Sequence, residues 1–264
     1  MTRPSGQKLI SDPLALLVEG SFLFKDLPLD SLRPHLSAAP LVVEKLYSNR
    51  PIYTAFRPDS WLDYLYVVID GGPVIMRSTP LDRVIAMTYP QGCFGTRSLP
   101  VGFGTLAQGF PSLVEAYKTT DVVKVPLVAV KTLYEENSLF QQRYDRLLEL
   151  REKFQYHLLN CSTYPPQAVA SLLRALVYQE RSLGSQPGPD GGYRFDLPID
   201  LIARACQLNH RTVEQVLKGM AGAGYLRASK SGDHAVDQVH IVDPEELKEV
   251  YGATRDKVSW WPLK

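Results

Sequence analysis

Cysteine is scarce in this sequence: Cys93, Cys161 and Cys206 are the only three among 264 residues, and they lie far apart. Zinc ribbons and iron–sulfur cages need clustered thiolates, so neither is expected. An odd, sparse set suits a reducing compartment better than a disulfide scaffold. Long apolar runs are also missing, since Glu19 ends the short N-terminal run PLALLV. We therefore expect a cytoplasmic protein without a signal peptide or a membrane span.

The sequence also lacks a large excess of charge of either sign. Its net charge is +1, so a nucleic-acid partner would have to meet a local basic patch rather than a global basic field. No Ser-His-Asp arrangement, metal-ligand cluster or phosphate-binding P-loop is apparent, so we expect no enzyme, no metal site and no cofactor. With 264 residues, 45% of them hydrophobic, two globular domains are the first expectation.

The first half of the chain changes its pattern near residue 40. Helical spacing of apolar residues predicts short helices over 12–36. From about 40 to 126, short runs rich in Val, Ile, Tyr and Thr alternate with Pro and Gly, which predicts a β-sandwich or barrel. Asp-Gly-Gly at 70–72 follows one of these runs and predicts a tight hairpin.

A long helix is predicted over 137–161, where the sequence has no Gly or Pro. The pattern favours a coiled-coil contact between two copies, and the alternative is an amphipathic helix packed on its own domain. Arg151 interrupts the seam and needs a partner or a solvent-exposed position. The prolines of STYPPQ, at 162–167, end the helix as a hinge. The seam has spacings of four and three and consists of Phe140, Tyr144, Leu147, Arg151, Phe154, Leu158 and Cys161.

A helix–turn–helix pattern lies in the C-terminal part of the chain. A helix fits residues 199–206, a short turn follows, and Asn209 is a good N-cap for a second helix with an apolar stripe. Strand-like runs on either side of KSGD complete a winged helix–turn–helix, whose second helix would lie in the major groove of DNA. From 199 to 232 the chain has five basic residues and two acidic ones. The candidate DNA-binding residues are Asn209, His210, Arg211, Thr212, Gln215, Lys218 and Lys230.

The side chains of the second helix suit base reading as well as phosphate contact. Arg211 and Gln215 can pair with guanine and adenine edges, while Lys218 and Lys230 suit phosphates. Glu214 would repel phosphate on the same surface. It leaves open an alternative in which the winged helix binds another transcription regulator rather than DNA.

With these parts in order, the chain resembles the cyclic-AMP receptor protein (CRP/FNR) family of bacterial transcription regulators. The resemblance runs from about 20 to 250 and rests on DYLYVVIDGGPVIM, on VIAMTYPQGCFGTRSL at the phosphate-binding cassette and on LIARACQLNHRTVEQVL at the helix–turn–helix. It implies an α+β fold with N-terminal helices and a β-roll, which is a cyclic-nucleotide-binding-like jelly roll, over 1–136. A dimerisation helix over 137–161 and a C-terminal winged helix–turn–helix over 162–264 follow.

The cassette departs from that of family members that bind cyclic AMP. Thr96 follows Gly95 where those members carry a glutamate for the ribose, and GFPSLVEAYK lacks their Arg-Ser/Thr pair for the cyclic phosphate. The chain also looks similar to divergent cyanobacterial members, some of which respond to cyclic di-GMP. The resemblance thus implies a homodimer through 137–161 that binds double-stranded DNA and responds to a nucleotide effector, with cyclic di-GMP favoured over cyclic AMP.

Such an effector needs arginines that pair with phosphates or stack on guanine, and carboxylates for the guanine edge. Arginines and an acid near the expected roll and cassette supply these groups. The alternative for each arginine is a solvated surface charge. The candidate effector-binding residues are Arg57, Asp59, Arg77, Arg83, Gly95, Thr96, Arg97, Ser98 and Arg143.

Overall fold

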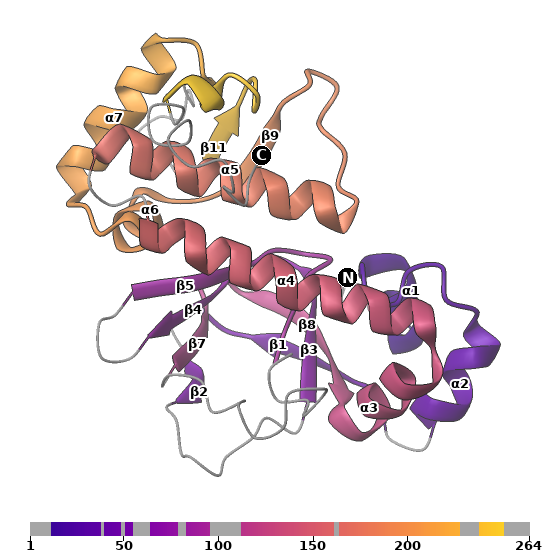
Figure 1. Ribbon diagram of the computed structural model, residues 1–264. Helices are drawn as coiled ribbons and strands as arrows, with labels where there is room; N and C mark the ends of the chain where they lie inside the picture. The colour runs from indigo at the N-terminus through magenta and orange to yellow at the C-terminus, as the bar shows by residue number, and fades with distance from the viewer. Residues whose placement is uncertain are drawn as a thin grey trace, which may run out of the picture.

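The structure, a computed structural model, has a β-rich lobe and a smaller, mainly helical lobe. Figure 1 shows the long helix α4 (Ser138–Asn160) running between the two lobes, with the C-terminal lobe on one side and the strands on the other. The structure describes residues 12–37, 40–48, 51–54, 64–78, 83–95, 112–160, 164–227 and 238–250.

Two short helices precede the strands, as the apolar spacing predicts. They are α1 (Pro13–Gly20) and α2 (Leu29–Ser37). Helix α1 begins at a proline, and the side chain of Asp12 accepts a hydrogen bond from the Leu14 amide at 3.1 Å. This N-cap satisfies a backbone donor that has no partner within the helix.

The predicted β-sandwich is confirmed. One sheet has the strand order β1-β8-β3-β6 and the other β2-β7-β4-β5, and every pair of neighbours is antiparallel. Apolar side chains from both sheets form a shared core. The strands are β1 (Val42–Leu46), β2 (Pro51–Thr54), β3 (Tyr64–Asp70), β4 (Val74–Ser78), β5 (Arg83–Thr88), β6 (Cys93–Phe94), β7 (Ser112–Ala116) and β8 (Thr120–Pro126).

The predicted hairpin at 70–72 is wrong. Strand β3 pairs with β6 and β8, whereas β4 pairs with β5 and β7, so the turn carries the chain from one sheet to the other. Gly71 and Gly72 have φ of +85° and +89°, and a Cβ at Gly71 would lie 2.4 Å from the Thr119 carbonyl oxygen. The two glycines therefore serve a tight crossing between sheets, which looks like a hairpin in the sequence.

Most of the predicted seam of α4 packs within its own chain, while Leu147 and Arg151 are half-buried, so the dimer contact through 137–161 stays a prediction. Helix α3 (Leu127–Glu136) ends at an extended Asn137, and α4 then lies along the roll. Phe140 and Tyr144 pack among α1, α2, α3 and the first sheet, while Phe154 and Leu158 pack with β5 and the C-terminal lobe. Cys161 lies outside the described residues. The exposed side of α4 is polar and includes Gln142, Asp145, Glu149 and Glu152.

The C-terminal lobe contains the expected helix–turn–helix and a three-stranded sheet in the order β10-β11-β9. Helix α6 has the predicted bounds of 199–206. Strand β9 was not predicted, because its residues follow a Gly/Pro-rich stretch; it pairs with β11 through main-chain contacts. The wing tip falls in 228–237, outside the described residues. The elements are α5 (Pro165–Leu183), β9 (Tyr193–Asp196), α6 (Ile199–Cys206), α7 (His210–Gly222), β10 (Leu226–Arg227) and β11 (Gln238–Ile241).

The two lobes share one hydrophobic core. Ile75 and Met87 of the roll lie in the same buried cluster as Phe154 of α4 and Leu176 of α5. Hydrogen bonds join the lobes as well: the Gln179 amide donates to the Met87 carbonyl at 3.0 Å. The Tyr89 hydroxyl donates to the Asp196 carbonyl at 3.0 Å, and Lys118 pairs with the Asp196 carboxylate at 2.7 Å.

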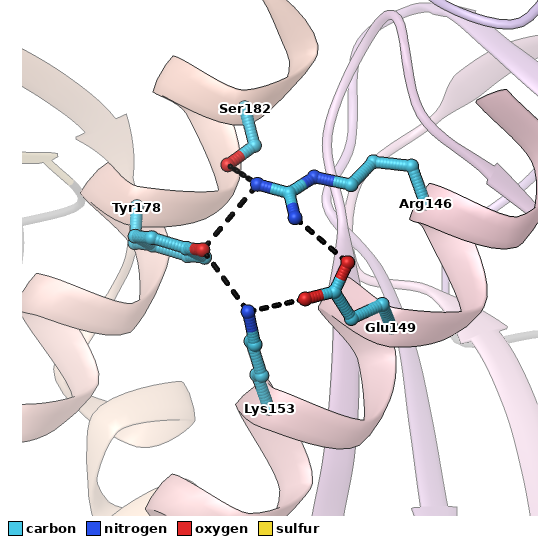
Figure 2. Close-up of polar contacts among 5 residues, drawn as sticks. All are labelled: Arg146, Glu149, Lys153, Tyr178 and Ser182. Atoms are coloured by element: carbon cyan, nitrogen blue, oxygen red, sulfur yellow. Dashed lines mark hydrogen bonds and ion pairs between the residues drawn. The ribbon is translucent and has the colours of Figure 1, made fainter. Parts of the chain in front are cut away.

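A polar network holds α5 against α4, as Figure 2 shows. Arg146 donates to the Glu149 carboxylate at 2.7 Å and to the Tyr178 hydroxyl at 3.3 Å. Lys153 pairs with the other Glu149 oxygen and donates to the same hydroxyl at 3.3 Å. Hydrogen bonds from Lys153 and Arg146 lower the pKa of Glu149. Within the part of the chain that the structure describes, no helix has the length and apolar character needed to cross a membrane.

Candidate functional site

Helix α7 is held in place by its apolar side and its first turn. Val213 and Met220 are buried against α5 and α6. The Asn209 side chain accepts a hydrogen bond from the Thr212 amide at 2.8 Å, so the N-cap prediction is confirmed. Gln207 has a φ of +55° and ends α6 in a left-handed conformation, which turns the chain sharply into α7.

The opposite side of α7 faces solvent. His210, Arg211, Gln215 and Lys218 are all exposed on it, together with Glu214. Arg211 and Lys218 have no ion-pair partner among the described residues. The predicted row of base-reading and phosphate-binding side chains therefore lies on one accessible surface of the helix.

Other basic residues near α7 already have acidic partners. Arg204 of α6 pairs with Asp200 at 3.1 Å, and Arg227 of β10 pairs with Asp190 at 3.3 Å. Lys230 lies outside the described residues. The local positive charge open to a ligand is therefore smaller than the residue count over 199–232 suggests.

The described candidate effector residues do not come together. Arg77 of β4 pairs with Glu115 of β7 at 2.8 Å, and both side chains are mostly buried. Arg83 of β5 donates to the Leu158 carbonyl of α4 at 2.6 Å. Each guanidinium thus joins two parts of the chain rather than lining a common anion pocket.

Arg143 lies at a different place again. It pairs with Asp26 at 3.7 Å, donates to the Lys25 carbonyl and stacks over the Phe22 ring with a centroid distance of 5.8 Å. These contacts fasten the start of α4 to the segment that follows α1. Gly95 is described at the end of β6 and has a φ of +92°. Arg57, Asp59, Thr96, Arg97 and Ser98 lie outside the described residues, so their roles remain predictions.

A pocket with a cavity volume of about 50 Å³ lies between the roll, α4 and α5. Such a volume holds a few water molecules. Its lining is mainly apolar, with one cation, one amide, one hydroxyl and one thiol among the walls. The lining residues are Val74, Ile75, Met76, Ala86, Met87, Thr88, Gly92, Cys93, Phe94, Val114, Leu147, Leu150, Arg151, Gln179 and Leu183.

Arg151 is the pocket residue that the candidate list missed. Its guanidinium donates to the Met76 sulfur at 2.8 Å, which is a weak acceptor. Burial raises the pKa of the Cys93 thiol to about 12, although the nearby Arg151 charge opposes that rise, so the thiol stays protonated and unreactive. The signal was present in the sequence, because a charged residue interrupts an otherwise apolar seam at this position.

Helix α5 closes one side of this pocket. Gln179 and Leu183 contribute to its wall, and the hydrogen bond from Gln179 to Met87 fixes α5 to β5. An enlarged pocket would therefore displace α5, to which α6 and α7 are packed. No group of His, Cys, Asp and Glu in the described ranges could hold a metal ion.

Solved structures share this fold at low sequence identity. FixK2 from Bradyrhizobium japonicum gives a TM-score of 0.58 at 15% identity and covers 80% of this chain and 98% of its own. A CRP-family transcriptional regulator from Thermus thermophilus gives 0.52 at 17% identity, with 79% and 96% covered. The c-di-GMP-responsive global regulator CLP from Xanthomonas campestris gives 0.52 at 13% identity, with 81% and 99% covered.

These likenesses concern the fold, because all three identities are far too low to carry a function. No protein-family pattern and no curated protein matches the sequence. The chain has the α+β fold of the CRP/FNR transcription regulators, with a β-roll, a long helix and a winged helix–turn–helix in that order. The fold that the sequence resemblance implies is thereby confirmed.

Proposed function

We propose that the protein is a transcription regulator that binds double-stranded DNA through α7, rather than an enzyme, and acts in the cytoplasm. The exposed row of Arg211, Gln215 and Lys218 on a helix fixed by its N-cap and apolar side carries this proposal. A helix with such side chains fits the major groove, where arginine and glutamine discriminate base edges. The fold shared with CRP/FNR regulators supports the same role.

Footprinting and gel-shift titration against genomic DNA test this role. Arg211→Ala is expected to lower specific affinity by about 5- to 150-fold, the range that one good base contact contributes. Arg194→Ala is the matched control, because Arg194 is an exposed arginine of the same lobe on β9. It should leave the base preference unchanged. A wild-type protein without sequence preference at low salt would contradict the proposal.

Glu214 supports one alternative function. This exposed acid lies beside Arg211 on α7 and would repel phosphate, as in a winged helix that binds another transcription regulator. Glu214→Gln separates the two functions. It should strengthen DNA binding if α7 reads DNA, and it should weaken capture of a partner regulator if α7 binds protein.

We also propose that the pocket beneath α4 and α5 receives a nucleotide effector, with cyclic di-GMP favoured over cyclic AMP. Arg151 supplies a cation for a phosphate inside largely apolar walls, and the responsiveness of the Xanthomonas regulator to c-di-GMP supports the choice. A dinucleotide is far larger than the present cavity. Binding would therefore move α5 away from the roll and reorient α6 and α7 with it.

Calorimetry with cyclic di-GMP, cyclic AMP and 2-oxoglutarate tests the effector. Heat is expected from cyclic di-GMP, and Arg151→Met should abolish it. Arg146→Met is the matched control on the same helix, because Arg146 is engaged with Glu149 outside the pocket. If none of the three compounds gives heat, the roll has no effector of this kind.

A homodimer is the assembly we propose, because paired recognition helices read two half-sites one DNA turn apart. Most of the seam of α4 packs within its own chain, so a second copy would meet the more exposed, polar side of this helix. Light scattering should give twice the chain mass of 29.6 kDa. A monomer at concentrations that saturate DNA would contradict this assembly.

A further inference from the structure

A continuous series of contacts between basic and acidic side chains connects the roll to His210, the first residue of α7. On β7, one oxygen of Glu115 faces Arg77 at 2.8 Å and the other faces Arg204 of α6 at 3.8 Å. Arg204 in turn pairs with Asp200 at 3.1 Å, and the second oxygen of Asp200 faces the His210 Nε2 at 3.3 Å. Glu115 and Asp200 thus each contact one basic side chain through one carboxylate oxygen and a second basic side chain through the other oxygen.

The two ends of this series lie in different surroundings. Glu115 follows Val114, a wall residue of the pocket, and its side chain is 12% exposed. His210 is the first residue of α7, and its side chain is 63% exposed. A mostly buried carboxylate interacts more strongly with its charged partners than an exposed one does, because water screens the charges less. The contacts of Glu115 in the roll should therefore be stronger than the contact of His210 at the start of α7.

The contact with Asp200 has a chemical consequence for His210. A neutral imidazole has one N–H donor and one acceptor nitrogen. If the Nε2–H donates to Asp200, Nδ1 is the acceptor that remains. In the major groove, the amino groups of adenine and cytosine are the donors that such an acceptor can meet.

We propose that Asp200 is a positioning residue that directs His210 toward adenine or cytosine, and that Arg204 and Glu115 tie this setting to the roll. This inference rests on the proposed DNA-binding function. It assigns a role in base selection to three residues outside α7, and it makes the selection depend on how the lobes dock. Displacement of α6 from β7 would break the Arg204–Glu115 contact and loosen Asp200.

Selection of operators from randomised duplexes measures the base preference. At the position read by His210, Asp200→Ala should reduce the preference for adenine or cytosine by about fivefold, the lower end of one base contact. Arg204→Met should reduce it partway, since this variant removes the ionic link while it keeps an apolar stem and the buried Arg77–Glu115 pair. An unchanged preference in both variants overturns the proposal.

Asp190→Ala is the matched control. Asp190 has nearly the same side-chain exposure as Asp200 and also faces a histidine and arginines, but these belong to β9, β10 and β11 rather than α7. The base preference of the Asp190→Ala variant should equal that of the wild type. A loss as large as that of Asp200→Ala would show that general loosening of the lobe explains the effect, and it would overturn the proposal.

A measurement without DNA separates this inference from the proposed function. Asp200→Ala should raise the rate at which diethylpyrocarbonate modifies His210 by about 1.5- to 5-fold, the size of effect that one exposed carboxylate contact has. Peptide mass spectrometry resolves this histidine from the others, and Asp190→Ala should leave its rate unchanged. If the wild type selects no DNA but this rate rises, the proposed function fails and the positioning contact stands. An unchanged rate overturns the contact itself.

Discussion

Helices α4 and α7 both carry an apolar stripe, and they differ in what their polar sides do. On α4, Arg146, Glu149 and Lys153 form a closed set of contacts with α5, so their hydrogen-bonding groups are already engaged (Figure 2). On α7, Arg211 and Lys218 project into solvent without an acidic partner among the described residues. The polar side of α4 therefore joins parts of the chain, whereas the polar side of α7 is open to solvent.

The largest expected effect concerns the buried side of α4. Phe140→Ala should lower the free energy of unfolding by about 3–5 kcal/mol, because the lost ring leaves a cavity among α1, α3 and the first sheet. Leu139→Ala, at the neighbouring position with 40% exposure, should cost much less. Urea denaturation measures both. Equal losses would mean that α4 does not pack on its own roll as described.

The start of α7 gives the next largest effect. Asn209→Ala removes the acceptor of the Thr212 amide and should lower the free energy of unfolding by about 1 kcal/mol. Asn209→Ser, which keeps an acceptor, should retain most of that stability. Thermal unfolding followed by circular dichroism compares the variants. If Asn209→Ala leaves the free energy of unfolding unchanged, packing alone fixes the start of α7.

Lys218 tests the exposed side of α7. Lys218→Gln should weaken binding to all DNA sequences alike and reduce the slope of log affinity against log salt by about one, because one phosphate contact is lost. Stability should not change, since the side chain is exposed. Fluorescence anisotropy over a series of salt concentrations measures the slope. A sequence-dependent loss would place Lys218 on a base instead.

The smallest effect compares the acids of the two helices. Glu149→Gln should cost less than about 1 kcal/mol at neutral pH, because the side chain is 45% exposed and its ion pairs are screened. The pKa of Glu149 is lowered from 4.5, so its contribution is present above that value and is lost as pH falls through the lowered pKa. The difference between variant and wild type should therefore shrink below about pH 4. Glu214→Gln, on the solvent-exposed side of α7, should leave denaturant unfolding at neutral pH unchanged.

The sequence predicts local features of the fold well. The bounds of α6 and the N-cap of α7 follow from turn and capping chemistry within a few residues. Helix α4 also follows from the absence of Gly and Pro. The surface against which α4 packs does not follow from the sequence, because an apolar stripe with spacings of three and four fits a second copy as well as the chain's own roll.

Long-range pairing is where prediction from the sequence fails. Asp-Gly-Gly at 70–72 carries a hairpin signal, but strand partners are chosen by the two sheets and not by the turn. The Arg77–Glu115 pair joins positions 38 residues apart, so nothing local marks Arg77 as occupied. Arg151 could have been named from its place in the seam, because a charge among apolar neighbours needs a reason.

The core that the lobes share has a consequence for dissection of the protein. Ile75 and Met87 belong to the same cluster as Leu176 and Val213, so the lobes should unfold in one cooperative transition rather than two. A winged-helix lobe produced alone would expose the apolar side of α5 that now packs in the shared core with α4 and the roll. Such a fragment would tend to self-associate, and its DNA affinity would not represent that of the whole chain.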